Sequence, residues 1–188
     1  MIKRGDRKIF KEFVSFLKDN KHQYNQIRLK LHKLLEQNVE INQKGYMGKT
    51  LLHIAVQLKD KKLVKMFLNS GVYIDLADQN GQTPLHYAVH SNRFELVKLL
   101  VENNADVNIG GEMEATPLHY AVFGGSLQIV KFLINNGADY NLVDENNLSP
   151  VDYAIDEENI EIIKYFMDKK IEEEKYNKIK KILERTKQ

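Results

Sequence analysis

The stretch Gly81-Gln82-Thr83-Pro84-Leu85-His86 has counterparts along the chain at one fixed interval. The phrase that begins at Thr83 returns as Thr50-Leu51-Leu52-His53, Thr116-Pro117-Leu118-His119 and Ser149-Pro150-Val151-Asp152, so each step is 33 residues. Two further series keep the same phase: Asn38, Gly71, Asn104 and Gly137, and Asn42, Asp75, Asn108 and Asn141. A period of this size predicts a stacked array of small supersecondary units. Such arrays usually present binding surfaces.

Residues 78–108 show how one unit is built. Asp78-Gln79-Asn80-Gly81 is a turn signature. Thr83 can cap a short helix, and Pro84 suits its first position because no N–H is needed there. A second helix should follow and end at Asn104, since Asn and Gly tolerate the left-handed conformation. Its broad apolar face comprises Phe94, Leu96, Val97, Leu100 and Val101.

Three columns of residues recur at the same step and predict one continuous core. The column of alanines lets neighbouring helices approach closely, and the two columns of larger apolar side chains fill the space between the units. The columns are Ala55, Ala88, Ala121 and Ala154; Val64, Val97, Val130 and Ile163; and Phe67, Leu100, Leu133 and Phe166.

The phrase Gly-x-Thr-Pro-Leu-His, with a second helix that ends in Gly137-Ala138-Asp139-Tyr140-Asn141, resembles the ankyrin repeat. The resemblance covers roughly residues 38–167 and implies an all-α ankyrin-repeat solenoid of stacked turn–helix–helix units. We divide the chain into an N-terminal helical cap (1–42), repeat one (43–75), repeat two (76–108), repeat three (109–141), repeat four (142–170) and a C-terminal capping helix or tail (171–188).

Three positions depart from the repeat pattern. Glu114 replaces the usual turn glycine in repeat three, so this turn is expected to differ in shape from its neighbours. Asp152 replaces the recurring His in repeat four, and Lys170 stands where the terminal Gly would fall. Repeat four therefore resembles the start of a C-terminal cap, which needs a polar outer face.

Both ends of the chain predict helices that cover the array. Residues 6–19 form a strongly amphipathic pattern, and residues 22–37 carry apolar residues at helical spacing. The alternative is a hairpin that binds a partner. In the C-terminal segment, an apolar stripe would cover repeat four, whereas its basic end could instead seek acidic partners or membrane surfaces. The stripe is Ile171, Tyr176, Ile179, Ile182 and Leu183.

Composition excludes several classes of function. The 188 residues are 43% hydrophobic and 29% charged, which is typical of a soluble globular chain. A net charge of only +2 argues against a main activity in nucleic-acid binding. The absence of Cys excludes disulfides and Cys-based zinc sites, and suits a reducing compartment. No uninterrupted apolar run predicts a secretory signal or a membrane span.

Apparent chemical motifs are better explained by the repeat. Gly48-Lys49-Thr50 resembles the end of a phosphate-binding loop, but Gln43 occupies the position of the required first glycine. His53, His86 and His119 stand one repeat apart, so they are expected to fix turns by hydrogen bonds and not to share a zinc ion. We expect no catalytic residue, no metal and no cofactor.

A column of lysines on the second helices resembles a ladder for phosphates, but a solvated outer face explains it better. Glu95 and Glu161 each precede a member by three residues, which favours ordinary exposed ion pairs. The column is Lys65, Lys98, Lys131 and Lys164.

The resemblance implies that a partner contacts the turn tips and the inner face of the first helices. Apolar residues at exposed positions there, Tyr46, Met47, Met113 and Phe123, are typical of interface anchors. The full set, by repeat, is Tyr46, Met47, Lys49, Gln57 and Leu58; Gln79, Asn80, Gln82, His90 and Ser91; Glu112, Met113, Ala115, Phe123 and Gly124; and Glu145, Asn146, Leu148, Asp156 and Glu157.

Three hypotheses about function follow. The first is a stoichiometric binder or inhibitor of another protein, either effector-like or immunity-like, in its own cytoplasm or delivered into that of a host. The second is a structural adaptor, which the sequence favours less because no further module is evident in it. The third, an enzyme or nucleotide-dependent regulator, lacks a catalytic constellation. We expect the free chain to be a monomer whose partner is another protein.

Overall fold

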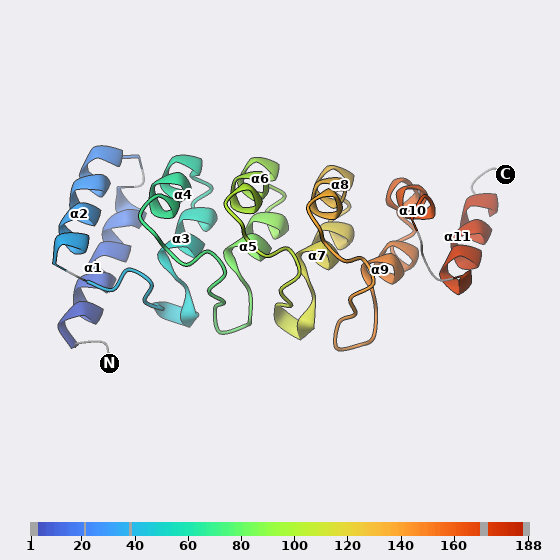
Figure 1. Cartoon of the computed structure of the whole chain (residues 1–188), viewed down its shortest axis with the longest axis horizontal. Coiled ribbons are helices and arrows are strands. Elements are labelled where there is room, and N and C mark those ends of the chain that lie inside the picture. The colour runs from blue at the N-terminus through green and yellow to red at the C-terminus, as the bar shows by residue number, and fades with distance from the viewer. Residues whose placement is uncertain (1–3, 21, 38, 170–172, 186–188) are drawn as a thin grey trace.

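Antiparallel helix pairs stack side by side in chain order, so the two termini lie at opposite ends of an elongated slab (Figure 1). The computed structural model describes residues 4–20, 22–37, 39–169 and 173–185. Within these ranges every regular element is helical, as the repeat predicted. None of the described helices is long and apolar enough to cross a lipid bilayer.

The helices alternate between an inner and an outer row (Figure 1). The inner helices of repeats one to four are α3 (Leu51–Gln57), α5 (Pro84–His90), α7 (Pro117–Phe123) and α9 (Pro150–Asp156). The outer helices are α4 (Lys61–Leu68), α6 (Phe94–Glu102), α8 (Leu127–Asn135) and α10 (Ile160–Met167). The terminal helices are α1 (Arg4–Asp19), α2 (Tyr24–Glu36) and α11 (Glu173–Arg185). Short 3-10 turns, η1 (Tyr46–Gly48) and η2 (Glu112–Glu114), precede α3 and α7.

The predicted columns form the core. Phe67, Leu100, Leu133 and Phe166 are all 0% exposed, and the alanine and valine columns are buried with them. Full burial of each large apolar side chain stabilises the fold by about 1.5–3 kcal/mol before entropy is counted. Because each column runs through consecutive repeats, the core is continuous along the slab.

The outer helices end where the sequence predicted. Gly71, Asn104 and Gly137 follow α4, α6 and α8 with φ values of 77°, 67° and 91°. This left-handed conformation ends a helix and is open chiefly to Gly and Asn. Asn38, the first member of this series, lies outside the described residues.

A polar series ties each of these ends to the next repeat. Asn42 Oδ1 accepts a hydrogen bond from the Tyr73 amide at 2.7 Å, and Asn108 Oδ1 accepts one from the Asp139 amide at 2.8 Å. Asp75 Oδ1 accepts from the Asp106 amide at 3.2 Å. The 33-residue spacing of this series therefore reflects backbone ties between repeats.

The N-terminal helices cover repeat one, as predicted for a cap. Buried residues of α1 and α2 belong to the same core as the repeats, and the rings of Phe13 and Phe67 meet edge-on with centroids 6.5 Å apart. Tyr24 Oη donates to Asp60 Oδ2 at 2.8 Å, which links α2 to the start of α4. The hairpin therefore packs most of its apolar side chains against the repeats, whereas Leu29 and Leu35 of α2 remain exposed.

The C-terminal helix α11 covers the other end. Ile179 is 0% exposed, and Ile182 and Leu183 are half-buried against the core. Tyr176 is 41% exposed, so it contributes less than the predicted stripe implied. Ile171 and Lys170 lie outside the described residues.

The lysine column lies on the outer row, but its ion pairs differ from those expected. Lys98 pairs with Glu102, at 3.7 Å between Nζ and Oε1, and Glu95 pairs with Lys61 of the preceding repeat. The prediction that Glu95 pairs with Lys98 is wrong because α6 brings Glu95 beside the neighbouring helix. Exposed pairs of this kind add little stability.

Candidate partner-binding surface

The turns before the inner helices project together along one edge of the slab (Figure 1). The four apolar residues predicted as contacts, three in these turns and Phe123 at the end of α7, are exposed: Tyr46 by 87%, Met47 by 39%, Met113 by 49% and Phe123 by 62%. Their exposure is as predicted, and their contact with a partner stays a prediction.

The four turns are of two alternating kinds. Repeats one and three read Gly45-Tyr46-Met47-Gly48 and Gly111-Glu112-Met113-Glu114, whereas repeats two and four begin with Asp78 and Asp144. In the first kind, Met47 and Met113 both adopt left-handed φ values, 54° and 56°. Glu114 follows with φ 57°, close to Gly48 at 74°. The turn of repeat three therefore differs in shape from its neighbours in repeats two and four, as expected, but it matches the turn of repeat one, where a glycine stands in place of Glu114.

In the second kind of turn, an aspartate organises the backbone. Asp78 Oδ1 accepts from the amides of Asn80 at 2.9 Å and Gln82 at 3.1 Å, and Asp144 binds the amides of Asn146 and Leu148 in the same way. Burial alone would raise the pKa of Asp78, but hydrogen bonds from Tyr87 and these amides hold it below its ordinary value. The charged carboxylate is therefore part of the turn.

Glycine is required where repeat three lacks this aspartate. A Cβ on Gly111 would lie 2.9 Å from Nε2 of His86, closer than a Cβ atom approaches another heavy atom. The turns also join in pairs, because the Gln79 amide donates to Met47 O and the Glu145 amide donates to Met113 O, each at 3.0 Å. The tips of repeats one and two, and of repeats three and four, are thus held together.

The recurring histidines fix these turns. In each of repeats one to three, Nδ1 accepts from the Thr amide that begins the phrase, at 3.2, 3.1 and 3.0 Å, so Nε2 carries the hydrogen. Nε2 of His53, His86 and His119 then donates to a carbonyl of the next repeat, at 2.9, 3.2 and 3.0 Å. The acceptors are Gln82 O, Ala115 O and Leu148 O.

Burial holds these imidazoles neutral. It lowers the pKa of His86 to about 4, and it lowers the pKa of His53 and of His119 as well. With both nitrogens engaged, none of the three has a lone pair directed at a shared ion. In the part of the chain that the structure describes, no three His, Asp or Glu side chains converge as ligands for a metal.

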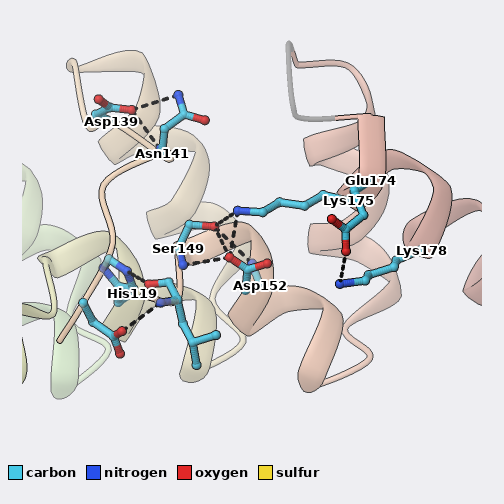
Figure 2. Close-up of polar contacts among 10 residues, drawn as sticks. His119, Asp139, Asn141, Ser149, Asp152, Glu174, Lys175 and Lys178 are labelled. Atoms are coloured by element: carbon cyan, nitrogen blue, oxygen red, sulfur yellow. Dashed lines mark hydrogen bonds and ion pairs between the residues drawn. The ribbon is translucent and has the colours of Figure 1, made fainter. Parts of the chain in front are cut away.

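In repeat four, an aspartate replaces the recurring histidine. Asp152 takes the place of the histidine, and its Oδ2 accepts from the amide and the hydroxyl of Ser149 at 2.8 and 2.6 Å (Figure 2). Lys175 of α11 reaches the same carboxylate, at 2.8 Å between Nζ and Oδ2. At this position the histidines of repeats one to three bind the next repeat, whereas Asp152 binds the C-terminal helix.

A tyrosine column lines the inner row, and sequence reasoning missed it. Tyr87, Tyr120 and Tyr153 recur every 33 residues, so their spacing alone would have revealed them. Each ring packs edge-on against the histidine of the preceding repeat, with centroids 5.3, 5.7 and 5.3 Å apart. Tyr87 and Tyr153 donate to Asp78 and Asp144 at 2.7 and 2.9 Å, whereas Tyr120 accepts from Gln82 at 3.1 Å.

Two of these tyrosines form a pocket with the exposed apolar residues of repeat three. The pocket has a volume of about 280 Å³ and lies between η2, the inner face of α7 and the start of repeat four. It brings together four predicted contact residues, Glu112, Met113, Ala115 and Phe123. Its lining is Glu112, Met113, Ala115, His119, Tyr120, Phe123 and Tyr153.

Other predicted contact residues lie elsewhere or serve the fold. Tyr46 and Met47 form a separate tip in repeat one. Ala115 is mostly buried, at 7% exposure, although it lines the pocket, and its contact with a partner stays a prediction. Five residues are half-buried and already engaged or packed: Lys49, Leu58, Gln82, Ser91 and Leu148. The remainder are exposed: Gln57, Gln79, Asn80, His90, Gly124, Glu145, Asn146, Asp156 and Glu157.

Comparison with known families agrees with this geometry. A family model described as ankyrin repeats, in three copies, matches residues 22–111 and matches again over residues 109–178. No curated protein matches the chain. Ankyrin repeats are generally protein–protein interaction modules. The chain belongs to the ankyrin repeat family.

Proposed function

We propose that the chain is a stoichiometric binder of another protein, and that it acts as an inhibitor or sequestering partner through its turn tips and inner helices. One observation carries the proposal: Met113 and Phe123 are 49% and 62% exposed, yet they line a single pocket with Tyr120 and Tyr153. Exposed aromatic and Met side chains that gather around a hollow are typical of interface anchors.

The distribution of charge along the same surface supports this proposal. Lys44, Lys49 and Lys59 lie in repeat one, whereas Glu145, Asp156, Glu157 and Glu158 lie in repeat four. The loop between inner and outer helices shows the change at one equivalent position, which reads Lys59, Asn92, Gly125 and Glu158. A graded surface selects the orientation of a partner and speeds association.

The inner face offers little for chemistry. The hydroxyls of Tyr87 and Tyr153 donate to aspartates, and the histidines are held by turns, so these groups are committed to the fold. A reducing cytoplasm, the cell's own or a host's, is the setting that we propose, because the chain contains no Cys.

Affinity purification of the tagged chain from its native cells, followed by mass spectrometry and calorimetry of the purified pair, tests the proposal. We expect one partner with a one-to-one stoichiometry. Binding should fall by at least about tenfold in the double variant Met113→Ala/Phe123→Ala. A partner that binds this double variant with undiminished affinity would contradict the proposed surface, and a complex of many components would favour an adaptor.

A further inference from the structure

The pocket in repeats three and four has room for one apolar side chain. Its volume of about 280 Å³ lies just below the roughly 300–1,000 Å³ of small-molecule sites. Met113 forms one wall from the tip of η2, and Phe123 forms another from the end of α7. An aromatic or large aliphatic group entering from a partner would be covered on both sides.

Apart from the carboxylate of Glu112, the polar side chains in the pocket wall are already engaged. Tyr153 donates to Asp144, Tyr120 accepts from Gln82, and both nitrogens of His119 are hydrogen-bonded. Burial and the bond to Asp144 raise the pKa of Tyr153 to about 12, so its phenol stays neutral. A polar side chain would gain few new hydrogen bonds here and would lose its water, which favours an apolar occupant.

Acidic residues border this apolar pocket. Glu112 lines it, and the amide of Glu145 donates to Met113 O at its edge. Asp156 follows Tyr153 by three residues on α9, hence on the same side of the helix. Glu157 and Glu158 continue the acidic row, and all five of these side chains are exposed.

Two lysines of α11 have carboxylate partners of their own. Lys175 is held by Asp152, and Lys178 pairs with Glu174 at 2.9 Å (Figure 2). Lys178 also interacts electrostatically with Asp156, so this one carboxylate is partly compensated, and the other carboxylates of the border keep it negative. The aromatic rings of the wall add ring faces that attract cations.

We propose that this site binds an extended segment of a partner protein in which one aromatic or large aliphatic residue is adjacent to Lys or Arg. The apolar side chain enters the pocket, and the cations meet the acidic border formed by Glu112, Glu145, Asp156, Glu157 and Glu158. This proposal rests on the proposed protein-binding function, and it names the kind of partner segment that one part of the surface binds.

Selection from a displayed library of random linear peptides, with the whole chain as target, tests the proposal. We expect enriched peptides to combine an apolar anchor with basic residues, and their affinity to fall with added salt. Fluorescence anisotropy with one enriched peptide should show a loss of about tenfold or more in Phe123→Ala. A comparable loss is expected in Asp156→Lys/Glu157→Lys. Glu161→Lys, the same change of sign at an exposed position of the outer helix α10, is the control and should change little.

Three results would overturn the proposal: no enrichment, enrichment of acidic or purely polar peptides, or peptides that bind Phe123→Ala as tightly as the parent chain. If only the Tyr46→Ala variant fails to bind the enriched peptides, the binding site lies in repeat one. That outcome would refute the chemistry proposed for this pocket and leave the protein-binding function standing. The protein-binding function itself fails only if affinity purification from the native cells yields no stoichiometric protein partner.

Discussion

The carboxylate of Asp152 and the ammonium group of Lys175 lie 2.8 Å apart, each about one-sixth exposed, at 17% and 18% (Figure 2). In repeats one to three a histidine at this position bonds to a carbonyl of the next repeat. After repeat four the structure describes α11 in place of another repeat, and the aspartate keeps the cap on Ser149 while attracting a lysine from α11. Burial would raise the pKa of Asp152, but the hydrogen bonds from Lys175 and Ser149 hold it below its ordinary value.

Removal of this lysine should loosen the C-terminal cap. Lys175→Met leaves a half-buried carboxylate without its cation, and we expect the free energy of unfolding of repeat four to fall by about 1–3 kcal/mol. Amide hydrogen exchange in α9, α10 and α11 measures this loss. The matched control is Lys178→Met, whose side chain is 56% exposed and paired with an exposed glutamate, and it should shift stability by less than about 0.5 kcal/mol. Equal exchange in the two variants would contradict the role of the Asp152 pair.

The end of α4 provides a prediction about the backbone alone. At Gly71, φ is 77° and an added Cβ would meet no atom within 4 Å, so any cost of substitution comes from conformation. Gly71→Val should lower the free energy of unfolding by about 1–3 kcal/mol, because a β-branched residue is strained at positive φ. Gly71→Asn should cost less, since Asn104 occupies the equivalent position at φ 67°. Urea unfolding compares the two, and equal midpoints would show that the left-handed conformation is not the cause.

Much of this fold could be predicted from the sequence because each repeat carries its own local signals. Thr83 and Pro84 define a helix start, and Asn104 defines a helix end, without reference to the rest of the chain. The stacking then follows from the constant step, since equivalent apolar residues must lie one above another. The exposure of Tyr46 and Phe123 follows from the same register.

The remaining features depend on contacts between repeats. No local pattern shows that Gly111 is required by the ring of His86, or that Lys175 reaches Asp152, because each pair meets only after stacking. The pocket likewise needs Met113 from one repeat and Tyr153 from the next. The alternation of Gly and Asp at the start of the turns was readable, but it appears only when the repeats are compared two steps apart.

The three neutral histidines predict a loss of stability in mild acid. The folded pKa of His86 is about 4, below the ordinary value of 6.5, so between these values the unfolded chain binds more protons than the folded chain. The free energy of unfolding should therefore be largest above about pH 6.5 and fall as the pH drops toward 4. His53 and His119 act in the same direction because burial lowers their pKa too.

Urea unfolding at a series of pH values measures this slope. His86→Gln, which cannot take up a proton, should give a shallower slope between about pH 6.5 and about pH 4. A slope that is equally steep in His86→Gln and in the parent chain would contradict the role of buried imidazoles.

The hydrogen bonds of the recurring histidines predict that the chain does not bind zinc. Each recurring histidine has both ring nitrogens engaged, so zinc binding would require three turns to open. Elemental analysis after dialysis should find no stoichiometric zinc, and a chelator should leave the thermal midpoint unchanged. Zinc that is retained at one equivalent and lost in His86→Ala would refute this assignment.

The last prediction concerns how a partner lies on the array. With lysines in repeat one, carboxylates in repeat four and Phe123 between them, a partner should place its acidic end over repeat one and its basic end over repeat four. Phe123→Ala should weaken binding by about 1–3 kcal/mol. Lys98→Ala, on the outer row and paired with Glu102, should change affinity little. Calorimetry of the purified complex measures both variants.

Charge reversal then tests the orientation itself. Lys49→Glu and Glu157→Lys should each slow association, and a partner variant with an acidic residue reversed should restore binding only to the chain variant whose charge it complements. Because long-range attraction is screened by salt, the rate differences should shrink at high ionic strength. A larger loss from Lys98→Ala than from Phe123→Ala would mean that the partner binds the outer helices. That result would refute the binding surface, because the tips and the outer row lie on different sides of the slab.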